Sequence, residues 1–242
     1  MKITRSWVLW QSNCHAVSVK VRLFDYLKGR VIMTFKEKHN AVVGENTVQA
    51  LNSRGMEAYY YNTRAEAVEK ILSLIPEGSS VTWGGTQTIT ELGIDSVLKS
   101  GKYEVFDREA AEEPEEKRAI ELRAFDADYF LMSANAISQD GVLVNIDGNG
   151  NRVAALCYGP RNVIVAAGIN KVAPTEEDAL KRAKNIAAPT NAIKRGGDYP
   201  CITTGRCEDC RLETCICRNI VIIRMCRDKR IKVVLFGEEA GF

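Results

Sequence analysis

A stretch rich in glycine, asparagine and aspartate, residues 138–171, holds most of the polar side chains that could bind or transform a small molecule. Apolar runs at 129–132 and 163–167 are typical of buried strands. Polar loops beside buried strands of an α/β domain commonly bind ligands at the strands' carboxyl ends. The alternative is turn formation, because Asp-Gly and Asn-Gly favour turns without any ligand. We predict a ligand site with these residues: Asp140 and Asp147 as catalytic groups, and Asn145, Asn149, Asn151, Arg152, Asn170 and Lys171 as ligand-binding groups.

A second polar loop follows the apolar run at 80–83 and precedes a helix that begins near residue 87. Its residues are Gly84, Gly85 and Thr86. A strand, a glycine turn and a helix N-terminus together can expose backbone N–H groups to an anion. Two glycines can also form only a tight turn. We predict that this loop lines the same cleft as the central stretch.

The cysteines form the third feature with chemical potential. Five of the eight fall between Cys201 and Cys217, in the pattern C-x5-C-x2-C-x4-C-x-C. So short a segment can surround one zinc ion or one iron–sulfur cluster, and the spacing does not separate the two. Redox disulfides and plain reduced thiols are the alternatives. The absence of a signal peptide and the clustering of the cysteines favour thiolate ligands in a cytoplasmic protein.

Composition excludes several classes of function. The two histidines, His15 and His39, lie near the N-terminus, so the rest of the chain cannot hold a Ser-His-Asp triad or a histidine-rich metal site. Acid–base work must fall to Asp, Glu, Lys, Tyr or Cys. The net charge of +2 comes from mixed charges, which indicates no nucleic-acid partner. No stretch approaches the roughly 20 apolar residues of a membrane span.

Strands and helices alternate along most of the chain, which predicts an α/β fold with a mostly parallel sheet and helices on both faces. We expect residues 35–242 to form one domain that includes the cysteine-rich segment 200–217. Residues 1–34 lie outside it, either as an extension before a natural start at Met33 or as an added edge strand and helix. Parallel strands are expected near 57–61, 80–83, 103–106, 129–133 and 163–167, and two closing strands at 220–223 and 231–236.

From about Phe35 to Phe242 the sequence resembles the lactate-utilization (LUD) domain family. The matching segments are residues 138–141, 144–153, 158–160, 168–171, 188–191 and 200–217. The resemblance implies a fold like that of the sugar-phosphate isomerases and CoA transferases, in which the loops at 84–86 and 140–141 line one pocket. The family's cysteine pattern implies four metal ligands, with Cys215 as an extra residue that points away. Those ligands are Cys201, Cys207, Cys210 and Cys217.

Some members of the family act with an iron–sulfur subunit in oxidising L-lactate. The first hypothesis is therefore a subunit or accessory of such a system, with a small carboxylate in the pocket, an iron–sulfur partner subunit and a cluster at the cysteines. The second is an isomerase-like enzyme or binding protein for a phosphorylated or CoA-linked metabolite. Against it, the chain shows neither the isomerases' Gly-Ala-Asp-Glu run nor an identifiable nucleophilic glutamate of a CoA transferase. The third is a zinc-stabilised binding module without chemistry.

Overall fold

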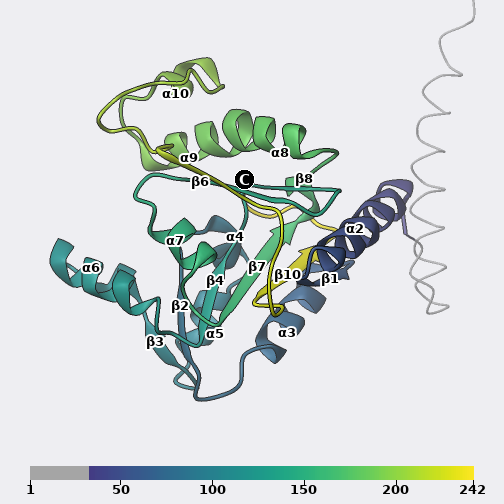
Figure 1. Cartoon of the computed structure of the whole chain (residues 1–242), viewed down its shortest axis with the longest axis horizontal. Helices are drawn as coiled ribbons and strands as arrows, with labels where there is room; N and C mark the ends of the chain where they lie inside the picture. Colours follow the sequence, from purple (N-terminus) through teal and green to yellow (C-terminus); the bar gives the residue numbers. More distant parts are fainter. Residues whose placement is uncertain (1–32) are drawn as a thin grey trace, which may run out of the picture. The chain divides into compact units, whose positions relative to one another are not determined.

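The computed structural model describes residues 33–242 (Figure 1). The predictions for residues 1–32 lie outside the described residues. The chain divides into two compact units, Met1–His39 and Asn40–Phe242. Helix α2 (Phe35–Ser53) begins in the first unit and continues into the second. The second unit contains the other helices and strands of the described residues, and it is described by itself below.

A parallel sheet of six strands forms the centre of the second unit. Its strand order is β1-β10-β7-β4-β2-β3, and every neighbouring pair is parallel. This confirms the predicted α/β class. β10 lies between β1 and β7, so the two predicted closing strands do not pair with each other. The strands are β1 (Glu57–Tyr61), β2 (Ser80–Trp83), β3 (Glu104–Phe106), β4 (Tyr129–Met132), β7 (Asn162–Gly168) and β10 (Ile231–Phe236).

Helices cover both faces of this sheet. Along β7, Val163 and Val165 pack with one cluster of apolar side chains, whereas Ile164 and Ala166 pack with another. Successive residues of a strand point to opposite faces, and a strand buried on both faces is therefore apolar throughout. α2 and α7 supply the first cluster, and α3, α4 and α5 the second. The helices are α3 (Arg64–Ser73), α4 (Gln87–Glu91), α5 (Ile94–Leu98), α6 (Pro114–Arg123), α7 (Asn151–Cys157) and the short 3₁₀ helix η1 (Arg108–Ala110).

A second, smaller sheet has the order β8-β5-β6-β9. Figure 1 shows it beyond the carboxyl end of β7, with α8 and α9 on its far side. A polar loop was predicted in the stretch 138–171, but strands β5 and β6 form an antiparallel hairpin at its beginning. The hairpin strands are short, and buried polar residues interrupt their apolar pattern. The strands are β5 (Ala136–Ser138), β6 (Leu143–Asp147), β8 (Val172–Ala173) and β9 (Asn219–Ile223).

One long helical segment covers the small sheet. It comprises α8 (Glu176–Arg182), a π-helical turn η3 (Ala183–Ala187) and α9 (Ala188–Arg195). Pro189 lacks a backbone N–H, so the regular α-helical hydrogen bond to Asn185 cannot form at this turn. The short helix α10 (Pro200–Thr204) then leads into the cysteine segment. Within residues 33–242 no helix combines the length and apolar character needed to cross a membrane.

Candidate functional site

Three neighbouring strands of the main sheet end at a buried lysine. Lys171 lies in a 3₁₀ turn (η2, Ile169–Lys171) directly after β7, and it is 3% exposed. Its Nζ donates to Thr88 Oγ1 at 2.9 Å and to Ser133 Oγ at 2.9 Å. Ser133 follows β4 and Thr88 lies in α4 after β2. Ligands of open α/β sheets bind beside the carboxyl ends of the strands, which is where this lysine lies.

The surroundings of Lys171 disfavour its charged form. Burial lowers the pKa of Lys171 from its ordinary value of 10.5 to about 7. The positive charges of Arg182 and Arg152 lower that pKa further, and the carboxylate of Glu91 opposes them. A lysine with such a pKa carries a neutral amine in part of the molecules near neutral pH. It can therefore accept a proton as well as donate one.

Arg152 is the centre of a second group of contacts, beside Lys171. Its guanidinium donates to the Ser133 carbonyl oxygen at 3.1 Å, the Ile146 carbonyl oxygen at 2.6 Å and Asn145 Oδ1 at 3.0 Å. Nε lies 3.4 Å from Asp147 Oδ2. Burial lowers the pKa of Arg152, and the charge of Asp147 opposes that change. Arg152 thus contacts Asn145 and Asp147 directly, and Ser133 links Arg152 to Lys171. Of these, Asn145, Asp147, Arg152 and Lys171 were predicted as site residues.

Asn135 connects Arg152 with a third cation, the partly buried Arg182, and it was not predicted as a site residue. Its Oδ1 accepts from Arg152 Nη2 at 3.1 Å, and its carbonyl oxygen accepts from Arg182 Nη1 at 2.5 Å. Arg182 also donates from Nε to the Asn170 carbonyl oxygen at 2.8 Å. A signal for Asn135 was available, because Ser133 and Asn135 are polar residues placed immediately after a buried strand.

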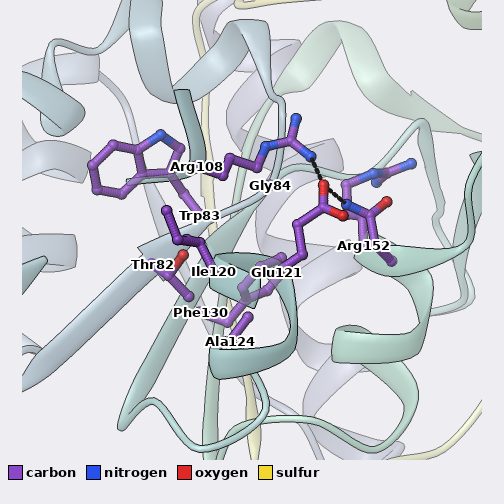
Figure 2. A pocket seen from close by; sticks show the side chains of 10 residues that line it. Thr82, Trp83, Gly84, Arg108, Ile120, Glu121, Ala124, Phe130 and Arg152 are labelled. Atoms are coloured by element: carbon purple, nitrogen blue, oxygen red, sulfur yellow. Dashed lines mark hydrogen bonds and ion pairs between the residues drawn. The ribbon is translucent and has the colours of Figure 1, made fainter. Parts of the chain in front are cut away.

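A small hollow opens beside Arg152, toward α6 (Figure 2). Its free space is about 10 Å³, which is room for about one water molecule. Glu121 Oε1 accepts from Arg108 Nη1 at 2.8 Å and from Asn151 Nδ2 at 2.7 Å. Arg108 and Glu121 were not predicted as site residues, because they lie in η1 and α6 rather than at strand ends. The lining residues are Thr82, Trp83, Gly84, Arg108, Ile120, Glu121, Ala124, Phe130, Asn151 and Arg152.

Gly84 lines this hollow and Gly85 follows it, and both are glycines for a reason other than the one expected. The Gly84 N–H donates to the Leu131 carbonyl oxygen at 3.1 Å, and the following helix α4 has only 5 residues. The predicted anion site at this helix N-terminus is therefore poor, because the Gly84 N–H is already bonded and the helix is short. Instead, the missing side chains make room for two arginines. A Cβ on Gly84 would lie 2.9 Å from Arg152 Cδ, and one on Gly85 would lie 2.6 Å from Arg108 Nη2.

We expect the two glycines to respond differently to alanine. Gly84→Ala should cost about 1–3 kcal/mol of the free energy of unfolding, because the stem of Arg152 is buried and its guanidinium is held by several acceptors. Gly85→Ala should cost less than about 1 kcal/mol, because the end of Arg108 can turn aside. Urea denaturation of the two variants measures both values. Equal losses would contradict the close packing of Arg152 against Gly84.

Some predicted site residues lie elsewhere. Asp140 is exposed in the β5–β6 turn, where Arg54 Nε donates to its carbonyl oxygen and Arg54 Nη2 lies 3.6 Å from its carboxylate. Asp147 lies at the other end of β6, roughly 15 Å of strand away. Asn149 is exposed in the loop before α7. Asn170 donates to the Gly241 carbonyl oxygen at 3.2 Å, and Thr86 occupies the N-cap of α4. The structure does not bring four of the predicted residues to the hollow: Thr86, Asp140, Asn149 and Asn170.

The cysteine segment forms a second hollow, with about 70 Å³ of free space. All five cysteines between Cys201 and Cys217 line it. Asn185 of the π-helical turn accepts a hydrogen bond from the Cys207 N–H at 3.2 Å, which attaches the segment to the helices over the small sheet. Burial, with smaller effects of the other thiols, raises the pKa of Cys217 to about 12. A positive charge in this hollow would favour the thiolates. The remaining lining residues are Ile146, Lys184, Ala188, Pro189, Glu208, Asp209 and Ile220.

The spacing of the thiols differs from the prediction in two ways. Cys215 was expected to point away, which is wrong: its Sγ lies 3.9 Å from Cys210 Sγ, and it accepts from the Cys217 N–H at 3.4 Å. Within residues 33–242, no three His, Cys, Asp or Glu side chains lie close enough together to hold one metal ion. The four predicted ligands therefore share a hollow but not a single coordination sphere.

Both hollows lie within the part of the chain that matches a known protein family. The LUD domain matches residues 44–236, which is most of the chain and includes the whole cysteine segment. The chain belongs to the LUD domain family. This family is linked to lactate utilization in general. The hollow beside Arg152 and the cysteine hollow are thus both parts of one LUD domain, and the resemblance identified from the motifs is confirmed.

Solved structures similar to this LUD-domain chain include a DUF162 family protein from Deinococcus radiodurans. It shares 11% identity at a TM-score of 0.48, and the match covers 82% of this chain and 98% of that protein. eIF2B delta from Chaetomium thermophilum shares 17% identity at a TM-score of 0.33, over 50% of this chain and 54% of that protein. No curated protein matches the chain. At these TM-scores the fold rests on the strand order described above.

Proposed function

We propose that this LUD-domain protein is a subunit or accessory of an iron–sulfur-dependent system that oxidises L-lactate or a similar 2-hydroxy acid. The family's general link to lactate utilization supports the substrate class. The observation that carries the proposal is the set of five thiols around one hollow. Five cysteines within 17 residues, none of them in a disulfide, are typical of thiolate ligands.

The donor chemistry of the hollow fits a thiolate-bound centre. Four thiolates of a structural zinc site surround one metal at about 2.3 Å, which places all the sulfurs within one sphere. In an iron–sulfur cluster the cysteines bind different irons, so the sulfurs stand further apart. Cys210 and Cys215 stand 3.9 Å apart, while no three described side chains converge, so the choice of a cluster rests on the family's link to lactate utilization. Such a cluster supplies one-electron transfer when bound.

The polar network at the strand ends supports the other half of the proposal. Oxidation of a 2-hydroxy acid to the 2-oxo acid releases two electrons and two protons. The electrons require an acceptor, for which we propose an iron–sulfur partner subunit. Lys171 is suited to accept one of the protons, because its amine is partly neutral near pH 7. The guanidinium of Arg108, at the hollow beside Arg152, is suited to hold the carboxylate, since arginine pairs with carboxylates in a fixed geometry.

Metal analysis and a visible spectrum of anaerobically purified protein test the proposal. We expect iron and inorganic sulfide with visible absorption. Cys210→Ser should lose most of both, because Cys210 lines the hollow. Cys157→Ser is the matched control: Cys157 is exposed at the end of α7 and does not line the hollow, so this variant should keep its iron. Stoichiometric zinc without iron would contradict the electron-transfer role and would favour a zinc-stabilised binding module.

A further inference from the structure

We infer that the hollow beside Arg108 and Arg152 is a carboxylate-binding site in which Glu121 of α6 occupies the position of the ligand's own carboxylate. The ligand is a small monocarboxylic acid, and an incoming molecule displaces Glu121 from Arg108 and Asn151. The choice of a 2-hydroxy acid as ligand rests on the proposed function. The location of the site and the competition with Glu121 rest on the contacts shown in Figure 2.

The contacts of Glu121 are those that a bound carboxylate would make. One oxygen, Oε1, accepts from Arg108 Nη1 at 2.8 Å and from Asn151 Nδ2 at 2.7 Å. Both donors belong to elements other than α6: Arg108 lies in η1 and Asn151 in α7. Gly85 leaves room for the Arg108 guanidinium beside the loop after β2. The donor pair is therefore built by the rest of the domain, and α6 only supplies the acceptor.

Charge balance favours a monoanion over a phosphate. Arg108 and Arg152 line the hollow, and three carboxylates lie close to them: Glu121, Glu109 at 3.1 Å from Arg108 Nε, and Asp147 at 3.4 Å from Arg152 Nε. Exchanging Glu121 for another carboxylate leaves this balance unchanged. A phosphate dianion would add a negative charge beside carboxylates that remain, and like charges at such distances repel.

The walls of the hollow fit a short carbon chain. Trp83, Ile120 and Phe130 present apolar surface, while the polar groups gather around the two arginines. The site thus offers apolar contact for the body of the ligand and the donors of Arg108 and Asn151 for its oxygens.

Helix α6 is attached weakly enough to withdraw Glu121. None of its residues is buried, and Leu122 is 55% exposed. Its Arg123 pairs with Glu104 at 3.4 Å on the surface, and this guanidinium also lies over the Phe106 ring. Exposed ion pairs contribute little to stability. Segments with few buried apolar contacts open at low cost, so a shift of α6 exposes the donors of Arg108 and Asn151.

Calorimetric titration of the full-length protein with L-lactate tests this inference. We expect Glu121→Gln to lower the Kd for L-lactate by about tenfold, because a neutral amide competes for Arg108 less strongly than a carboxylate. Arg108→Met should abolish binding. Glu116→Gln is the matched control, since it removes one charge from an exposed position on the same helix and should leave the Kd unchanged. Thermal melts of each variant show whether the fold is kept.

Each result of the titration either supports or overturns the inference. A tenfold gain for Glu121→Gln with none for Glu116→Gln supports the inference. An unchanged or weaker affinity in a folded Glu121→Gln protein overturns it, as does an absence of L-lactate binding in every variant. Inorganic phosphate binding as tightly as L-lactate to Glu121→Gln overturns the assignment to a carboxylate. The metal content of the same preparations is independent of this titration, so failure here is distinguishable from failure of the iron–sulfur proposal.

Discussion

Replacing Arg152 with methionine should destabilise the protein by about 3–5 kcal/mol, which is the usual cost of removing one partner from a buried ion pair. The Arg152 side chain is 13% exposed and that of Asp147 is 8% exposed. Without the guanidinium, the Asp147 carboxylate and the carbonyl oxygens of Ser133 and Ile146 lose their donor. A buried acceptor without a donor bears the full cost of its desolvation. Urea denaturation measures the change.

Two further variants separate the ion pair from general loss of a large side chain. Arg161→Met, at an exposed position before β7, should change the free energy of unfolding by less than about 0.5 kcal/mol. In Arg152→Met/Asp147→Asn no buried charge is left unpaired, so the double variant should lose less stability than the sum of the two single changes. Additive losses would show that Arg152 and Asp147 do not act as a pair.

Replacing Lys171 with methionine should stabilise the protein most at low pH. The pKa of Lys171 is about 7 in the folded chain against an ordinary 10.5. Below pH 7 both states are protonated, and the folded state bears the full cost of a buried ammonium. Between these two pKa values the unfolded chain binds more protons, so the stability of the natural protein rises with pH. The advantage of Lys171→Met should therefore shrink by up to about 5 kcal/mol between about pH 6 and pH 10.

The measurement is urea denaturation of both proteins across this pH range, because the titration of all other groups then cancels in the difference. Lys194→Met serves as control: Lys194 is exposed and donates to Gln87 Oε1 at 2.7 Å, so this variant should not show the change of stability expected for Lys171→Met. At high pH, Lys171→Met should be the less stable protein, since Thr88 and Ser133 lose a hydrogen-bond donor. A pH-independent difference would mean that Lys171 titrates normally in the folded chain.

Lys171 and Arg152 were both predicted as site residues from their sequence positions, whereas Asp140 and Asp147 show the limit of such reasoning. Both aspartates stand beside a glycine in the central stretch. In the structure they lie at opposite ends of β6, one exposed near Arg54 and the other buried beside Arg152. Asp-Gly pairs look alike in sequence whether they make a turn or a site. Only the β5–β6 hairpin places the two aspartates at different ends of a strand. Its short strands have no clear apolar pattern in the sequence.

The amino-acid sequence by itself determined the main sheet, because strands buried on both faces are apolar throughout and that pattern is local. It also determined which segment holds the cysteines. The tertiary structure alone decided that β9 joins the small sheet, that Cys215 faces Cys210, and that Arg108 and Glu121 meet Asn151 at the hollow. These contacts join residues far apart in the chain or depend on how a loop folds. Their partners are chosen by the packing of whole helices and strands, which leaves no periodic signal in the sequence around them.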